Sequence, residues 1–178
     1  MSRSLFLAAA LALGGYSLQE PSAVKPSEPV KPTEFGAISY YEAKCARCHG
    51  PQGSFLVPGF AKEKDDAALT EVTKRMADGP GGAPLEDRDL KIEVAYMRAV
   101  SEGKPFLVWT KDGEKWEGES DVEKLKATVD GQAVEIAVKD GVWTLAKGKK
   151  MILEAGEGEK AVRLDSDLSN VSQSVERN

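Results

Sequence analysis

Cys45-Ala46-Arg47-Cys48-His49 holds both cysteines and the only histidine of this 178-residue chain. The residues that lead into it favour a short helix over 38–45, and a loop rich in glycine and proline, from Gly50 to Gly59, follows it. Two intervening residues allow one helical turn to present both thiols on one side, with the imidazole directly after them. Three side chains with ligand chemistry therefore meet at one point of the predicted fold.

A C-x-x-C-H sequence is typical of covalent c-type haem attachment. Each thiol adds across one vinyl group of the porphyrin, and the histidine then coordinates the iron as proximal ligand. We therefore expect one covalent haem c, tethered by Cys45 and Cys48 and ligated by His49. Because the chain has no second histidine, bis-histidine ligation within one molecule is excluded.

Three other interpretations of this stretch have less support. A structural zinc site needs four ligands, whereas the chain offers two thiols and one imidazole, with Cys48 and His49 adjacent. A thioredoxin-like dithiol is expected near a βαβ pattern, and the sequence has none. A disulfide across two residues is strained and uncommon.

The N-terminal segment has the pattern of an export signal. A start containing Arg3 precedes an apolar run over 5–13, and small residues (Gly14, Gly15 and Ser17) follow near a cleavage point. The run is shorter than the ~20 residues of a membrane-spanning helix. We expect a signal peptide over 1–17 and a periplasmic or other extracytoplasmic location, with an uncleaved membrane anchor as the alternative. Residues 18–33, with four prolines, are expected to form an extended linker.

Residues 34–104 are expected to form a small all-α domain. A second helix is predicted to begin at Asp65-Asp66 and to end at Gly79-Pro80, with an apolar stripe of Leu69, Val72 and Met76 facing the core. A last helix is predicted from about residue 86 to residue 102, before Gly103. Its apolar stripe is formed by Leu90, Val94 and Met97.

From Pro105 the pattern changes to alternation with a period of two, interrupted by turns at Asp112-Gly113, Asp130-Gly131, Asp140-Gly141 and Lys147-Gly148. Residues 105–165 are therefore expected to form a small antiparallel β module, a meander or small sandwich, followed by a polar tail over 166–178. The chain is predicted to be α+β in two parts. We expect buried tryptophans in the module and a solvated acidic face, formed respectively by Trp109, Trp116 and Trp143, and by Glu114, Glu117, Glu119, Asp121 and Glu123.

Residues 36–103 resemble a class I cytochrome c domain. The resemblance rests on the haem-attachment motif and on a set of weaker features: Tyr41 four residues before the first cysteine, Gly53 and Pro58 in the loop, Gly79 at the helix end, Pro84-Leu85, and Ala95-Tyr96-Met97-Arg98. It implies that the first and last helices cross with Tyr41 and Tyr96 at their contact. It also implies that the Pro58 carbonyl accepts a hydrogen bond from His49 Nδ1; a simple loop proline is the alternative.

The chain departs from this family at the distal iron ligand. The resemblance places a methionine at the position of Ala83, which has no atom that binds iron. Met76 is the substitute candidate, although Met76 and Met97 are expected in the core and Met151 falls among the strands. Lys62 or Lys64 would have to lose a proton to coordinate. We therefore expect a haem with a distal ligand other than methionine, or none.

The expected function is that of a monohaem cytochrome that carries single electrons outside the cytoplasm between redox partner proteins. The chain is not expected to be an enzyme by itself. Two alternatives remain open: a haem protein that binds or senses small ligands such as carbon monoxide or nitric oxide, and a haem subunit of a larger, membrane-associated oxidoreductase. A net charge of −5 with no basic run argues against nucleic acid as a partner.

Overall fold

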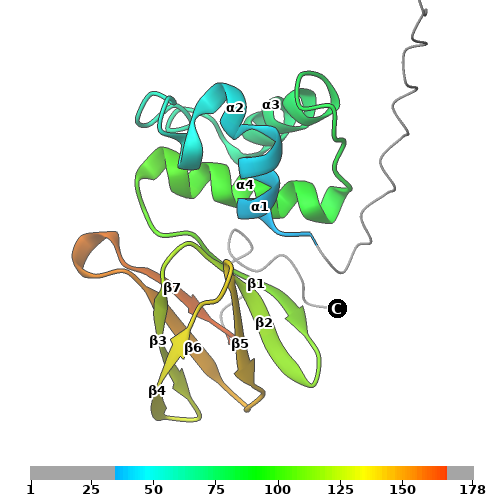
Figure 1. Ribbon diagram of the computed structural model, residues 1–178. Coiled ribbons are helices and arrows are strands. Elements are labelled where there is room, and N and C mark those ends of the chain that lie inside the picture. Colours follow the sequence, from blue (N-terminus) through cyan, green and yellow to red (C-terminus); the bar gives the residue numbers. More distant parts are fainter. Residues whose placement is uncertain (1–34, 168–178) are drawn as a thin grey trace, which may run out of the picture.

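The computed structural model describes residues 35–167, in which helices cover one end of a pair of antiparallel sheets (Figure 1). The predicted α+β class is confirmed. The expected signal peptide over 1–17 and the linker over 18–33 lie outside the described residues, and so does the tail from residue 168. Ser166 still belongs to the fold, because its side chain accepts a hydrogen bond of 2.9 Å from the Met151 amide.

Four helices and one short 3₁₀ turn make up the helical part: α1 (Ala37–Lys44), α2 (Ala46–His49), η2 (Pro51–Gly53), α3 (Asp66–Asp78) and α4 (Asp87–Glu102). The Asp65 carboxylate caps α3 by accepting a hydrogen bond of 2.7 Å from the Ala68 amide. Gly103 ends α4 in the left-handed conformation, which glycine adopts without steric cost. The three helices expected from the sequence are thus confirmed, and α2 is an added turn that carries the cysteine motif.

Seven strands form two sheets, with the orders β1-β2-β5 and β4-β3-β6-β7. The strands are β1 (Leu107–Asp112), β2 (Lys115–Ser120), β3 (Lys124–Val129), β4 (Gln132–Ala137), β5 (Val142–Ala146), β6 (Met151–Ala155) and β7 (Val162–Asp165), with a 3₁₀ turn η3 (Gly158–Lys160) before β7. Both residues of Asp130-Gly131 and of Asp140-Gly141 have positive φ, as two-residue hairpin turns require. The first turn joins β3 to β4, and the second carries the chain from one sheet to the other.

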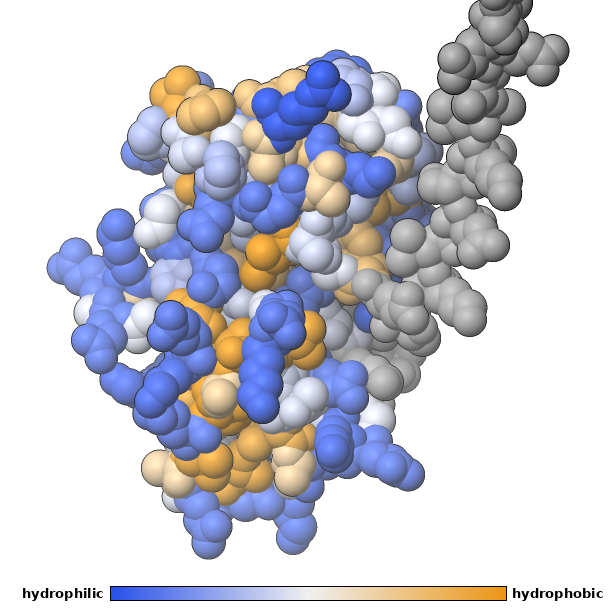
Figure 2. All heavy atoms as spheres, viewed as in Figure 1, coloured by the Kyte–Doolittle hydropathy of each residue, from blue (hydrophilic) through white to orange (hydrophobic). Residues whose placement is uncertain are grey.

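The two sheets enclose an apolar core of their own. All three tryptophans are buried, as predicted, together with Met151 and the leucines of β3, β6 and β7. In the view of Figure 2, apolar residues are visible over the sheets and at the junction with the helices, and polar residues cover most of the remaining surface. The β part is therefore a two-layer unit with a continuous interior.

β1 links the two parts because its alternate side chains enter different cores. Leu107 and Trp109 lie in the core between the sheets. Phe106, just before the strand, and Val108 instead pack into the helical core, which is formed with Ala37, Tyr41, Ile92 and Tyr96. The helices therefore rest directly on the sheets through shared side chains.

Two expectations about individual side chains are wrong. Met76 is 41% exposed, because Leu69 and Ala77 are the buried side chains of α3. Glu119, which was expected on a solvated acidic face, is only 5% exposed. Its burial follows from the packing of α1 on β2, which no pattern within residues 114–123 encodes.

Candidate functional site

Cys45, Cys48 and His49 lie on one helical turn directly after α1. Cys45 ends α1, with its amide donating to the Tyr41 carbonyl at 2.8 Å, and it also begins α2. The amides of Cys48 and His49 then donate to the Cys45 carbonyl at 3.1 and 3.0 Å. Both thiols are free, Cys45 half-buried and Cys48 exposed. The turn therefore presents two unbonded sulfurs and one imidazole within five consecutive residues.

Aromatic packing fixes the helix that leads into this turn. The rings of Tyr41 and Tyr96 meet edge to face, with centroids 5.4 Å apart, and Phe106 adds a second such contact to Tyr96 at 5.2 Å. The predicted crossing of the first and last helices at Tyr41 and Tyr96 is confirmed. Because Phe106 precedes β1, the sheets contribute to holding the cysteine turn in place.

The loop after the turn carries exposed apolar side chains. The Phe55 amide donates to the His49 carbonyl at 2.9 Å, so the loop is tied to the motif. Phe55 and Val57 are each 73% exposed, and Met76 on α3 is exposed as well. Phe55 and Val57 are two positions apart, so the loop that follows the motif presents two large apolar side chains to solvent.

The segment that follows α3 is held by its backbone. The Tyr40 hydroxyl donates to the Ala83 carbonyl at 2.6 Å. The Ala83 amide donates to the Ala77 carbonyl at 3.0 Å, and Gly81 binds the Met76 carbonyl at 2.8 Å. The position that the family resemblance assigns to the distal ligand thus carries a methyl group on a segment tied to α1.

The remaining candidate ligands lie in different surroundings. Met97 is half-buried between two clusters of the helical core, and Met151 is fully buried between the sheets. Lys64 Nζ donates to the Phe60 carbonyl at 3.2 Å. Pro58 is exposed, and within residues 35–167 the structure records no hydrogen bond between His49 and Pro58. The hydrogen bond from His49 Nδ1 to the Pro58 carbonyl stays a prediction.

A buried carboxyl group on α4 was not predicted. Glu93 of α4 is 1% exposed, and neither of its carboxyl oxygens has a hydrogen-bond partner within the described part of the chain. Burial, together with the charge of Glu119, raises the pKa of Glu93 to about 8. The sequence did contain a signal: Glu93 shares a helical face with Leu90, Tyr96 and Val100, at the spacings of an apolar stripe.

Glu119 of β2 reaches the start of α1. Its Oε2 accepts a hydrogen bond of 2.8 Å from the Ala37 amide, where the helix dipole favours a negative charge. Burial raises the pKa of Glu119 to about 7, although the amides of Ala37 and Ile38 lower it. Burial also raises the pKa of the Cys45 thiol to about 11, and the charge of Glu93 adds to this shift. Cys45 is therefore a protonated thiol near neutral pH.

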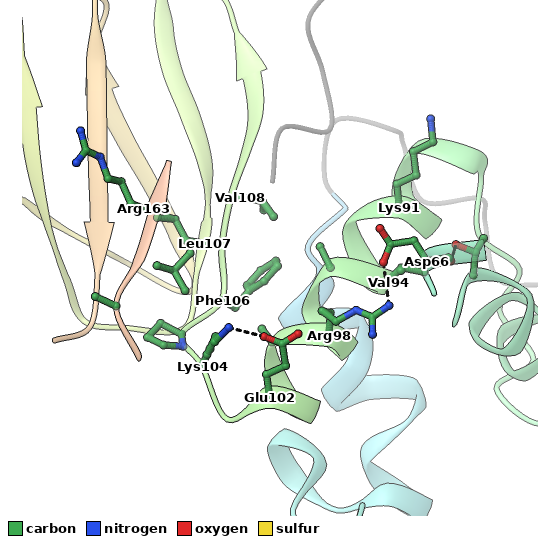
Figure 3. A pocket seen from close by; sticks show the side chains of 16 residues that line it. Asp66, Lys91, Val94, Arg98, Glu102, Lys104, Phe106, Leu107, Val108 and Arg163 are labelled. Carbon is green, nitrogen blue, oxygen red and sulfur yellow. Dashed lines mark hydrogen bonds and ion pairs between the residues drawn. The ribbon is translucent and has the colours of Figure 1, made fainter. Parts of the chain in front are cut away.

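A separate cleft of about 460 Å³ opens between α4 and strands β1 and β7, and none of the three motif residues lines it (Figure 3). Two ion pairs lie among its lining residues: Arg98 binds Asp66 at 2.8 Å, and Lys104 binds Glu102 at 2.7 Å. Its remaining lining is largely apolar. The cleft is therefore separate from the cysteine turn.

Among residues 35–167 the structure contains no helix long and apolar enough to cross a membrane and no group of three or more His, Cys, Asp or Glu side chains placed to hold a metal ion. Comparison with protein-family models, with curated proteins and with solved structures finds no match to this chain.

Proposed function

We propose that this chain is a monohaem c-type cytochrome that carries single electrons outside the cytoplasm. The observation that carries the proposal is the helical turn with two free thiols and the only histidine. Export rests on the pattern of residues 1–17, which the described part of the chain does not include.

The side chains around the turn fit a covalently held porphyrin. Cys45 and Cys48 would hold it by thioether bonds, and His49 would ligate the iron. Cys48 is exposed and thus accessible for attachment, and no disulfide competes for either sulfur. Phe55, whose amide is bonded to the His49 carbonyl, supplies exposed apolar surface that an apolar macrocycle would cover.

When bound, haem supplies a one-electron couple between ferric and ferrous iron. The contribution of this chain is to hold its ligand-bearing turn still. The Tyr41–Tyr96–Phe106 contacts fix α1 on α4, and the Tyr40 hydroxyl fixes the segment at Ala83. A rigid surrounding suits electron transfer, because little structure has to reorganise when the charge changes.

The test is the mass and absorption of the full chain, exported in a bacterium that attaches c-type haem. We expect the mature polypeptide plus the mass of one haem, a c-type spectrum and a reversible one-electron couple in a potentiometric titration. Cys45→Ser with Cys48→Ser should give colourless protein, whereas Ser39→Ala, an exposed control on α1, should keep the haem. Colourless wild-type protein without added mass would refute the proposal.

A second candidate function is the binding of a small gas such as carbon monoxide or nitric oxide. The favouring observation is Ala83, which offers no ligand where the resemblance expects one, on a segment held by both backbone groups. Addition of carbon monoxide to the reduced protein separates the candidates. A spectral change in the wild type supports gas binding; a change only in Met76→Leu identifies Met76 as the distal ligand of an electron carrier.

A further inference from the structure

Glu93 on α4 is a buried carboxyl group that the proposed haem attachment does not involve. It interacts electrostatically with groups of helix α1 and strand β2. The carboxyl group is 1% exposed, and among residues 35–167 it has no hydrogen-bond donor. Because burial penalises the carboxylate, such a group holds its proton to a higher pH than an exposed carboxyl group does.

The charged groups around Glu93 strengthen this effect. The carboxyl group that acts on it is that of Glu119 on β2, which carries the same charge. The charge of Glu93 in turn raises the pKa of Tyr40 and Tyr41 on α1, of Cys45 at the end of that helix, and of Tyr96 on its own helix. Further out, Arg88 and Asp89 of α4 act on Glu119, Asp121 and Glu42 act on Tyr96, and Asp78 acts on Tyr40.

The charge of Glu93 also acts on Cys45, one of the two proposed haem attachment residues. The charge of Glu93 raises the pKa of the Cys45 thiol, so the two groups are electrostatically coupled. On the proposed function, the Cys45 sulfur is bonded directly to the porphyrin. A negative charge at Glu93 therefore stabilises the ferric form, which carries one more positive charge than the ferrous form.

We propose that Glu93 takes up one proton from solvent when the carrier accepts an electron, and releases it when the electron leaves. The electron comes from a one-electron donor protein, and the proton converts the Glu93 carboxylate into a carboxylic acid, so that no charge accumulates in the interior. The chain is thus a carrier of a proton together with an electron. This inference rests on the proposed function.

The pKa of Glu93 allows proton uptake and reduction to be linked near neutral pH. Without a neighbouring cation the pKa of Glu93 is about 8, and a ferric centre nearby lowers it. We expect the reduced protein to bind this proton on the order of tenfold more tightly than the oxidised protein, the size expected for a unit charge acting within a protein. Glu93 then has one pKa in the oxidised protein and a higher one in the reduced protein. At pH values between these two, the reduction potential should fall as pH rises.

The test is the reduction potential of the full, haem-loaded chain from pH 5 to pH 9. The wild type should show a potential that falls with pH in a window near pH 7 to 8. Glu93→Gln should remove this slope and match the wild-type potential at pH 5, where Glu93 is protonated in both redox states. Glu71→Gln, an exposed carboxyl on α3, should keep the slope. An unchanged slope in Glu93→Gln overturns the inference.

Infrared spectra of the same chain separate the two proposals. The reduced-minus-oxidised spectrum should contain a carboxylic acid carbonyl band that Glu93→Gln lacks. Should no haem be attached, the proposed function fails, and a pH 6 minus pH 9 spectrum still shows whether Glu93 titrates. Should Glu93→Gln not fold, Glu119→Gln serves instead: without the like charge of Glu119 the window should move to lower pH, and an unmoved window counts against the coupling.

Discussion

At the scale of single residues, the neighbouring tyrosines Tyr40 and Tyr41 stabilise the fold in different ways, Tyr40 by a hydrogen bond and Tyr41 by ring packing. Tyr41 lies at the helix crossing, where the resemblance to a class I cytochrome c domain placed it, and its buried hydroxyl has no hydrogen bond of usual geometry among the described residues. The backbone of Gly53 lowers the pKa of that hydroxyl, but this is the smallest of the effects that act on it. The Tyr40 hydroxyl, in contrast, donates to the Ala83 carbonyl at 2.6 Å.

We therefore expect Tyr40→Phe to lower the free energy of unfolding by about 1 kcal/mol, because the Ala83 carbonyl loses its donor. Tyr41→Phe should leave stability unchanged or raise it slightly, since its hydroxyl is buried without a good partner. Urea denaturation of both variants checks this. Equal losses in the two variants would contradict the assignment of the hydrogen bond to Tyr40.

Part of the candidate site could be predicted from the sequence at this scale and part could not. Cys45, Cys48 and His49 are close in sequence, so their spacing alone predicted that they share one helical turn. The burial of Glu93 was readable from its helical face, but the approach of Glu119 depends on how β2 docks against α1. That docking joins residues 82 positions apart, which no local pattern records.

At the scale of elements, β2 depends on Gly118. This residue is paired with Trp109 on one side and Trp143 on the other. A Cβ atom at Gly118 would run into the Val108 carbonyl and would lie 2.5 Å from Cζ2 of Trp143. The tryptophan therefore crosses the strand at a point where only glycine leaves room.

Gly118→Ala should lower the free energy of unfolding by about 1–3 kcal/mol, because the methyl group overpacks against backbone and a fully buried ring. Thr144→Ala, exposed on the neighbouring strand β5, is the matched control and should change stability by less than about 0.5 kcal/mol. Thermal unfolding followed by tryptophan fluorescence measures both. A neutral Gly118→Ala would mean that Trp143 has space to move.

At the scale of the whole molecule, the helical part and the sheets cannot be separated cleanly. The turns and alternation that predicted the strands are local, and so are the stripes that predicted the helices. The contact between the helices and the sheets was not predicted, although the sequence contains a signal for it in four consecutive apolar residues, Phe106-Leu107-Val108-Trp109. Such a run indicates a strand buried on both faces, as β1 is, with one face on the helices and the other between the sheets.

A chain ended after residue 104 should therefore lose cooperative folding, because the core around Tyr41 and Tyr96 lacks Phe106 and Val108. In the full chain, Phe106→Ala should lower the free energy of unfolding by about 3–5 kcal/mol. Near-ultraviolet circular dichroism with chemical denaturation checks both changes. A truncated chain that unfolds cooperatively with the stability of the full chain would show that the helices need no sheet.

The contact between Glu119 and the start of α1 ties the helical part to a distant stretch of the chain. The Ala37 amide meets its acceptor only when β2 has formed and lies against α1, across a separation of 82 positions. The helix that leads into the two thiols is therefore completed by a strand, and a substitution in β2 acts on the cysteine turn as well as on the sheet.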